Sequence, residues 1–183
     1  MLNFDHDAAA FRDFIAMHQE RVYNAVLNRV QDIADAEEIT QDVFVDVYRN
    51  PGAWRGEAAV STWLYRIAMN KCVDHLRKKQ RRNRWSISGW FKPVGEEDDP
   101  AAGDFFHPGI AAENREKTTV LFKALKRLPH NQHTAWVLHE MDGRSYKEIG
   151  DIMQLSVSSV ESLLFRARQN LKKILSALYP GNL

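Results

Sequence analysis

Residues 142–173, DGRSYKEIGDIMQLSVSSVESLLFRARQNLKK, have the pattern of two helices separated by a sharp turn. Ser145 and Glu148 have the spacing of a capping box, which predicts a short helix ending near Met153. The turn is predicted at residues 154–156. A longer helix should follow, because apolar residues recur along one stripe at helical spacing. The residues of this stripe are Val160, Leu164, Ala167, Leu171, Ile174 and Leu178.

The apolar stripe leaves the other faces of the longer helix available to a partner. A short helix, a sharp turn and a longer helix with polar residues at its start is the arrangement that places a recognition helix in the DNA major groove. The residues on these faces include Ser159, Ser162, Phe165 and Arg166. An ordinary helical hairpin gives the same pattern, so this stretch favours DNA binding without establishing it.

Helical periodicity also dominates the rest of the chain, and no alternating strand pattern is evident. The spacing predicts helices over residues 8–30, 35–49, 61–79, 111–127 and 130–141, with Asp35 as the cap of the second and Ser61 or Thr62 as the cap of the third. Glycine, proline, serine and acids accumulate in residues 81–110, which predicts a flexible linker. We therefore expect an all-α protein of two small helical domains, residues 1–80 and 111–183, of which the second carries the helix-turn-helix.

The charges of this 183-residue chain are segregated along the sequence although the formal net charge is only +1. Residues 31–48 hold six acids and no base, whereas residues 62–92 hold nine bases and one acid, Asp74. Any attraction to nucleic acid must therefore come from local patches and not from the total charge.

A single cysteine, Cys72, excludes a disulfide and a cysteine zinc site within one chain, so we expect it to be a small buried residue, with a redox sensor as the alternative. The sequence has no apolar run of the roughly 20 residues that cross a bilayer, and residues 1–10 lack the features of a secretory signal. A soluble, cytoplasmic and reduced protein is the expectation.

The acidic stretch places Asp35, Glu38, Asp42 and Asp46 on one side of a predicted helix. Three interpretations are open: a solvated face, a docking surface for a basic partner, and a two-metal enzyme site. A metal needs ligands that converge on one point, whereas a row along a convex helix diverges. We therefore predict no metal site and no catalytic residue.

The basic stretch combines cations with aromatic residues. Trp54 lies in a glycine-flanked loop, and Trp63 and Tyr65 lie in the first turn of the predicted helix. Cations beside aromatic rings suit single-stranded nucleic acid, because phosphates take the charge and unstacked bases lie on the rings. Alternatively, Trp63 and Tyr65 are core residues and the arginines only solvate a surface.

Three segments closely resemble the signature segments of bacterial extracytoplasmic-function sigma factors, in order and in spacing. They are DAEEITQDVFVDVYRN (35–50), AWRGEAAVSTWLYRIAMNKCVDHLRKKQRR (53–82) and DGRSYKEIGDIMQLSVSSVESLLFRARQNL (142–171). The resemblance covers nearly all of the chain outside the predicted linker.

The resemblance implies a role for each segment. The acidic helix is similar to the surface that docks on the clamp helices of RNA polymerase, through Asp35, Glu38, Gln41 and Asp42. The loop and basic helix are similar to the part that melts the minus-ten element, where an unstacked base is flipped into a pocket. The residues implied there are Trp54, Arg66, Asn70, Lys71 and Arg77. Those implied in reading the minus-thirty-five element are Ser159, Glu161, Ser162, Phe165 and Arg166.

The chain departs from the family pattern at Glu161 and Leu163, where basic residues are frequent. A carboxylate in the groove repels phosphate, although it can accept a hydrogen bond from a cytosine amino group. Alternatively, Glu161 caps its helix together with Ser158. The acidic run at residues 96–99 is open to two interpretations as well, mimicry of nucleic acid or plain solubility.

The expected function is that of a sigma factor, with no catalysis, cofactor or small-molecule substrate of its own. The expected partners are core RNA polymerase, promoter DNA (duplex at minus thirty-five, single-stranded at minus ten) and an anti-sigma factor, which can hold such a protein at the membrane. The alternatives are a free-standing helix-turn-helix regulator and a nucleic-acid enzyme that uses the acidic residues.

Overall fold

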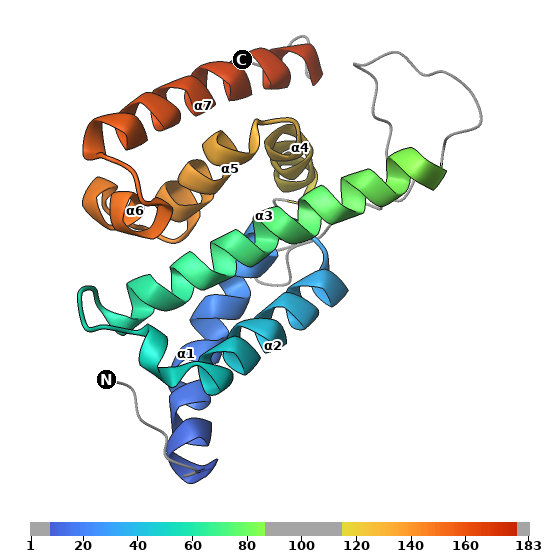
Figure 1. Ribbon diagram of the computed structural model, residues 1–183. Coiled ribbons are helices and arrows are strands. Elements are labelled where there is room, and N and C mark those ends of the chain that lie inside the picture. The colour runs from blue at the N-terminus through green and yellow to red at the C-terminus, as the bar shows by residue number, and fades with distance from the viewer. Residues whose placement is uncertain (1–7, 87–114, 179–183) are drawn as a thin grey trace.

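The computed structural model describes residues 8–86 and 115–178, and within them every regular element is helical (Figure 1). The all-α prediction is therefore confirmed for this part of the chain. The predicted linker lies mostly outside the described residues. The elements are α1 (Ala8–Val30), α2 (Ile33–Arg49), the 3-10 turn η1 (Pro51–Ala53), α3 (Val60–Ser86), α4 (Arg115–Lys126), α5 (His130–Trp136), the π-helical turn η3 (Val137–Met141), α6 (Tyr146–Met153) and α7 (Val157–Leu178).

The start of α2 differs from the prediction. Asp32 is the cap, and its side chain accepts a hydrogen bond from the Asp35 backbone N–H at 3.0 Å. The prediction that Asp35 caps this helix is thus wrong, because the capping position lies three residues earlier than predicted and the Asp32 carboxylate takes it. Asp35 instead lies within the first turn of α2, where its carboxylate can face a neighbouring helix.

The third helix is longer than predicted, since it begins at Val60 and extends to Ser86. The first helix, in contrast, has the predicted bounds. In the second half of the chain, Pro129 precedes α5, as predicted, and the helical stretch to Met141 is confirmed although its last part winds as a π-helical turn.

The predicted helix-turn-helix is confirmed. Ser145 and Glu148 form the capping box of α6, each bonding the backbone N–H of the other. Gln154 ends the helix in the left-handed conformation with φ of 57°. The turn is so tight that a Cβ on Gly150 would lie 2.8 Å from the Leu155 carbonyl oxygen, which explains a glycine at this position.

Two groups of helices pack on either side of α3 (Figure 1). Helices α1 and α2 lie on one side of it, and α4 to α7 lie on the other, with α7 outermost. One hydrophobic core runs through both groups, since Leu27 and Leu64 belong to the same buried cluster as Leu138 and Ile149. A smaller cluster, which includes Phe122 and Leu171, joins α4 to α7. We call this packing of α1 and α3 against η3 and α6 the closed arrangement.

Candidate nucleic-acid and polymerase interfaces

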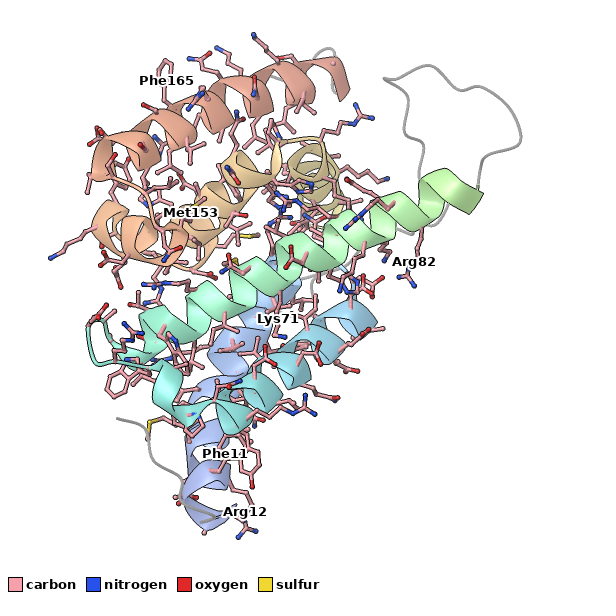
Figure 2. The ribbon with its side chains drawn as sticks, in the orientation of Figure 1. Phe11, Arg12, Lys71, Arg82, Met153 and Phe165 are labelled. Carbon is pink, nitrogen blue, oxygen red and sulfur yellow. The ribbon has the colours of Figure 1, made fainter. Side chains whose placement is uncertain are left out.

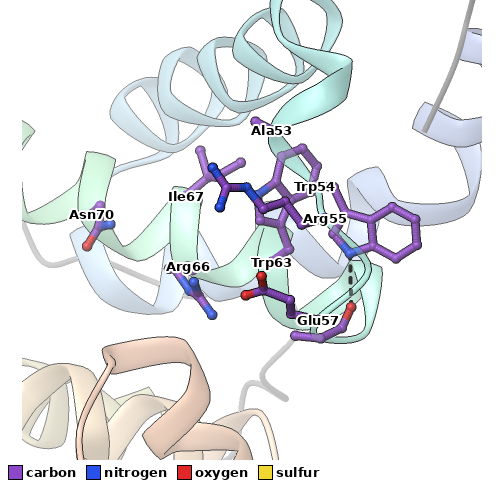
Figure 3. Close-up of a pocket in the computed structure, with 9 residues that line it drawn as sticks. Ala53, Trp54, Arg55, Glu57, Trp63, Arg66, Ile67 and Asn70 are labelled. Atoms are coloured by element: carbon purple, nitrogen blue, oxygen red, sulfur yellow. Dashed lines mark hydrogen bonds between the residues drawn. The ribbon is translucent and has the colours of Figure 1, made fainter. Parts of the chain in front are cut away.

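A pocket opens between the loop after α2 and the first turns of α3 (Figure 3). Its volume is about 380 Å³, within the roughly 300–1,000 Å³ of small-ligand sites. We call it the loop pocket. It is lined by Ala53, Trp54, Arg55, Glu57, Ala58, Trp63, Arg66, Ile67 and Asn70.

The loop that forms one wall of this pocket is held in shape by its own residues. The Trp54 indole Nε1–H donates to the Ala58 carbonyl oxygen at 2.9 Å and so closes the loop on itself (Figure 3). Gly56 takes φ of +78°, a left-handed conformation that favours glycine. Because the indole N–H is used within the loop, Trp54 can offer a partner its aromatic ring but no hydrogen-bond donor.

The loop pocket brings together three of the residues predicted to act at the minus-ten element: Trp54, Arg66 and Asn70. Asn70 is exposed, so its amide is free to approach a base edge. Arg66 is engaged in the closed arrangement, because its guanidinium donates to the Asp151 carbonyl oxygen of α6 at 3.1 Å. Its Nε is buried without a hydrogen-bond partner among the described residues, which indicates a group that is not optimally satisfied there.

The other two residues predicted at the minus-ten element lie outside the loop pocket. Lys71 lies between α3 and α2, with its Nζ 2.7 Å from Asp46 Oδ2 and 3.9 Å from Asp42 Oδ2 (Figure 2). Arg77 is 60 % exposed and lies 3.9 Å from Asp74 on the same helix. Lys71 is therefore neutralised within the protein, whereas Arg77 faces solvent.

Some of the carboxylates of α2 are paired with cations of α3. Lys79 Nζ lies 2.7 Å from Asp35 Oδ2 and 3.5 Å from Asp32 Oδ2. Hydrogen bonds and attraction to Asp35 and Asp32 raise the pKa of Lys79, although burial opposes this. Lys71, His75 and Lys79 follow one another at intervals of four, so one face of α3 lies along the carboxylates of α2.

The residues predicted to dock on polymerase differ in accessibility. The Asp42 side chain is 63 % exposed, and Glu38 and Gln41 are exposed as well. The Asp35 side chain is only 17 % exposed, because His75 and Lys79 cover it. Asp42, Glu38 and Gln41 form the accessible part of the predicted surface, which we call the acidic face.

One group of side chains on α2 and α3 has the composition of a metal site. Ligand atoms of Asp35, Glu38 and His75 lie within 4.8 Å of one another. The prediction that the carboxylates diverge was based on α2 alone. It did not include the His75 imidazole, which comes from α3. The Lys79 ammonium already neutralises Asp35 at 2.7 Å, so a cation would have to displace it.

The outer face of α7 carries the residues predicted to read the minus-thirty-five element. Glu161, Ser162, Phe165 and Arg166 line a shallow depression in this face. Phe165 is 64 % exposed and points away from the rest of the protein (Figure 2). The stripe on the opposite face is buried as predicted, at Val160, Leu164, Ala167 and Leu171.

The start of α7 is stabilised by serines. The Ser156 hydroxyl accepts from the Ser159 backbone N–H at 3.2 Å and bonds the Ser159 hydroxyl at 2.8 Å. Ser156 thus provides the cap, and the alternative in which Glu161 caps the helix with Ser158 is not adopted. Glu161 is exposed in the depression of α7, whereas Ser159 is half-buried and does not line it.

The contact between the two groups of helices was not predicted from the sequence. Arg29 of α1 is buried against Thr134, His133 and His130 of α5. The only sequence signal is a charged residue near the end of a mostly apolar helical stretch, residues 22–30. Residues 25–30 are all buried, as expected of a helix end that other helices cover from more than one side.

Two further polar contacts cross the same interface. The Arg144 guanidinium lies 4.2 Å from the ring centroid of Tyr65, a cation–π geometry. Asn28 Nδ2 donates to Asp142 Oδ1 at 3.4 Å. Burial raises the pKa of Asp142 to about 6, although the hydrogen bond from Asn28 and the charge of Arg144 oppose it.

Cys72 is fully buried at the centre of α3, as predicted. Burial raises the pKa of its thiol to about 12, so the group stays protonated and unreactive at neutral pH. Within the described residues, no helix has the length and apolar character that crossing a membrane requires.

Two family models match the chain. Residues 14–82 match sigma-70 region 2, and residues 119–171 match sigma-70 region 4. The first match spans α2, the loop pocket and most of α3, and the second spans the helix-turn-helix.

Curated relatives agree with these matches. The chain is similar to the RNA polymerase sigma-H factor of Pseudomonas aeruginosa, with 33 % identity over 172 residues, 94 % of this chain and 89 % of the relative. It is also similar to the ECF RNA polymerase sigma-E factor of Escherichia coli K12, with 32 % identity over 163 residues, 89 % of this chain and 85 % of the relative.

Solved structures share the fold. The sigma factor RpoE of Bartonella quintana, solved with the anti-sigma factor NepR, superposes with a TM-score of 0.68 at 20 % identity, over 91 % of this chain and 97 % of that one. CnrH, solved with the cytosolic domain of CnrY, gives a TM-score of 0.63 at 23 % identity, over 92 % and 88 %.

Proposed function

The chain belongs to the extracytoplasmic-function sigma factors of the sigma-70 family, and from this membership we propose how its surfaces divide the work of initiation. A sigma factor binds core RNA polymerase and directs transcription to promoters, as an initiation factor rather than a catalyst. The chain then needs no catalytic residue, metal or cofactor of its own. The observation that carries the assignment of its surfaces is the loop pocket, which combines a fixed indole, a cation and a free amide beside a basic helix.

We assign the loop pocket to the minus-ten element. Stacking of an unpaired base on Trp54 would contribute about 1–3 kcal/mol, which offsets the few kcal/mol needed to unstack the base. Asn70, exposed at the edge of the pocket, supplies the hydrogen bonds that distinguish one base from another. Arg66 and Arg77 attract the backbone phosphates. Lys71 can do so only after it leaves Asp46, which lies 2.7 Å away.

We assign the outer face of α7 to the duplex of the minus-thirty-five element. Its N-terminal half is presented by the helix-turn-helix, as a recognition helix requires. The bases and backbone would be contacted by Glu161, Ser162, Phe165 and Arg166, which line the depression, and by Ser159 at the start of the helix. Glu161 would favour a cytosine, because a carboxylate can accept from its amino group.

We assign the acidic face of α2 to core polymerase. Asp42, Glu38 and Gln41 are accessible without any rearrangement, whereas Asp35 is shielded by Lys79 and His75. Contact between Asp35 and a basic partner requires that these two side chains give way. Docking therefore begins at Asp42 and its neighbours, and Asp35 follows.

The two domains, residues 1–80 and 111–183, must separate to read both promoter elements. The elements lie about 25 base pairs apart, roughly 85 Å at 3.4 Å per base pair. A compact chain of this length has a radius of gyration of about 16 Å and is thus only roughly 40 Å across. The chain between Ser86 at the end of α3 and Arg115 at the start of α4 is long enough to span at most about 100 Å, and would keep the second contact effectively intramolecular.

We place the protein in the cytoplasm, where polymerase and promoter are found. An anti-sigma factor would hold it inactive, in keeping with the Bartonella quintana neighbour, which was solved with the anti-sigma factor NepR. Such a partner can also keep the protein at the membrane.

Transcription in vitro with purified core polymerase tests the proposal. Promoter-dependent initiation on addition of the full chain is the expected result. A shift of duplex DNA without polymerase would instead support a free-standing regulator, and metal-dependent turnover of nucleic acid would support an enzyme. Failure to bind core polymerase would overturn the assignment.

A further inference from the structure

A buried guanidinium joins the two domains in the closed arrangement. Arg29 is 2 % exposed and donates to Thr134 Oγ1 at 3.0 Å, to His133 Nδ1 at 3.2 Å and to His130 Nδ1 at 3.0 Å. No carboxylate pairs with Arg29 in the part of the chain that the structure describes. A buried cation without its hydrogen-bond partners is strongly destabilising. The closed arrangement therefore depends on these neutral acceptors.

The two imidazoles can accept from Arg29 in only one protonation state. Arginine has donors only, so both rings must present an unprotonated Nδ1 and carry their proton on Nε2. A protonated imidazole has no acceptor left, and it would place a second cation about 3 Å from the first. We propose that Arg29, His130 and His133 form a pH-sensitive lock, in which neutral imidazoles hold the two domains closed and their protonation opens them.

The other charged groups around the lock strengthen its response to acid. Burial lowers the pKa of His133 well below its ordinary value, and Arg29, His130 and Lys126 of α4 lower it further. Burial lowers the pKa of His130 as well, and Arg29 and Arg77 of α3 add to this effect. All the neighbours that act on these rings are cations or imidazoles.

The two remaining titratable groups of the lock do not change charge in the relevant range. Burial lowers the pKa of Arg29 to about 10, so it stays charged at neutral pH. Cys72 of α3, which acts electrostatically on Arg29, stays neutral because burial raises the pKa of its thiol to about 12.

The direction of the pH dependence follows from these shifts. In the open form the exposed imidazoles regain pKa values of about 6.5. Between that value and the lowered values of the closed form, the open form binds more protons. Acid therefore favours opening. For each proton taken up, the open-to-closed ratio rises by up to about tenfold per pH unit. Above pH ~6.5 the lock is fully engaged.

Asp142 acts in the opposite direction at the same interface. Burial raises its pKa from 3.8 to about 6 in the closed arrangement, so between these values its protonation favours closure. The Asp142 carboxyl therefore opposes acid opening only below about pH 6, and it is one group against the two imidazoles. The other polar contacts across the interface join Arg66 to the Asp151 backbone carbonyl and Arg144 to the Tyr65 ring, and neither involves a carboxylate or an imidazole.

Opening has a direct effect on the loop pocket. It breaks the hydrogen bond from Arg66 to Asp151 and moves α6 away from α3. Acidification of the surroundings therefore increases the fraction of molecules in which Arg66 is available to DNA.

Fluorescence energy transfer in the full chain measures the separation of the domains. Dyes are attached to Glu20→Cys in α1 and Lys172→Cys in α7, both exposed positions. Because Cys72 is fully buried, the dyes react with the introduced thiols. Transfer should be high at pH 8 and fall as the pH is lowered through 6.5 to 5.5, with helicity retained in circular dichroism. Constant transfer between pH 8 and 5.5 would overturn the proposal.

The matched variant is His130→Asn with His133→Asn. Asparagine places its Oδ1 near the position of the imidazole Nδ1 and cannot be protonated, so this variant should stay closed at pH 5.5. His18→Asn, a change on α1 outside the lock, should respond like the wild type. Acid opening of the double variant equal to that of the wild type overturns the proposal.

If the double variant is already open at pH 8, the test is made on the wild type, by NMR of its imidazole protons during a pH titration. Protonation of His130 and His133 that coincides with the loss of transfer supports the lock, and protonation without opening, or opening without protonation, overturns it. Neither polymerase nor DNA is needed, so failure of the lock leaves the proposed function intact.

Discussion

The Lys71 ammonium of α3 lies 2.7 Å from the Asp46 carboxylate of α2, and 3.9 Å from that of Asp42. The basic and acidic segments of the sequence thus neutralise each other in part, although each is also expected to contact a different macromolecule. Because the Asp42 and Asp46 side chains are 63 % and 47 % exposed, each ion pair contributes only about 0–1 kcal/mol, so a partner can displace it. A basic polymerase surface that approaches Asp42 therefore meets a carboxylate that is weakly held.

Asp42→Arg should weaken binding to core polymerase at least roughly tenfold, or about 1.4 kcal/mol. The new guanidinium would face the basic partner and would also lie beside Lys71, so like charges replace an attraction. Since the Asp42 side chain is 63 % exposed, the fold should be unaffected. Titration of the labelled protein with core polymerase, followed by fluorescence anisotropy, gives the Kd. Glu20→Arg makes the same charge change on α1 and should bind normally, and equal affinities of the two variants would refute the assignment.

Asn70→Ala should impair strand opening at the minus-ten element more than it impairs formation of the closed promoter complex. The amide is exposed beside the loop pocket, to which we assign the unstacked base of the open complex. Permanganate reactivity of thymines measures opening, and filter binding of holoenzyme to the promoter measures the closed complex. Gln80→Ala, which removes another exposed amide from α3, serves as the control. A permanganate pattern identical to that of the wild type would count against the role of Asn70.

The sequence predicted the elements that local patterns determine. The capping box of Ser145 and Glu148, the turn at Gln154 and the buried stripe of α7 are all as expected. Each depends on residues a few positions apart, so spacing alone is sufficient. The cap of α2 was wrong by three residues, because Asp32 and Asp35 are both good caps and local pattern does not choose between them.

Contacts between distant segments could not be predicted in the same way. Nothing in the spacing of Arg29 indicates that it meets His130 and His133 about a hundred residues later. Similarly, the sequence predicts Lys71 among the cations that face DNA. Its partner Asp46 lies on another helix, and spacing along one helix does not reveal that pair. Periodicity shows which face of a helix is buried, but it does not show which helix covers that face.

Arg166→Ala should reduce the affinity of holoenzyme for promoter duplex and flatten its salt dependence. Loss of one phosphate contact lowers the slope of log K against log salt by about 0.9. Arg166 is exposed on the outer face of α7, so the fold should not change. Promoter binding measured over a series of salt concentrations gives both quantities. Arg12→Ala removes the same charge from α1 and should leave the slope unchanged. An unchanged slope for Arg166→Ala as well would show that Arg166 does not contact DNA.

Gly150→Ala should destabilise the helix-turn-helix by about 1–3 kcal/mol. The added Cβ would lie 2.8 Å from the Leu155 carbonyl oxygen, which is backbone and cannot rotate away. Urea unfolding followed by circular dichroism measures the change in the free energy of unfolding. Gly52→Ala is the matched control, because nothing lies within 4 Å of its added Cβ, and it should change stability by less than about 0.5 kcal/mol. Equal stabilities of the two variants would show that the turn relaxes easily.

Asp142→Asn should steepen the opening of the domains by acid. In the wild type burial raises the pKa of Asp142 to about 6, so below that pH its protonation stabilises the closed arrangement and opposes the imidazoles. Asparagine keeps an Oδ1 acceptor for Asn28, which donates at 3.4 Å, but takes up no proton. Between pH 6 and 4 the open-to-closed ratio should then rise by up to about tenfold more per pH unit than in the wild type. Energy transfer across the same dye pair measures this, with Asp151→Asn, an exposed carboxylate of α6, as the control. A profile no steeper than that of the wild type would mean that Asp142 does not titrate with closure.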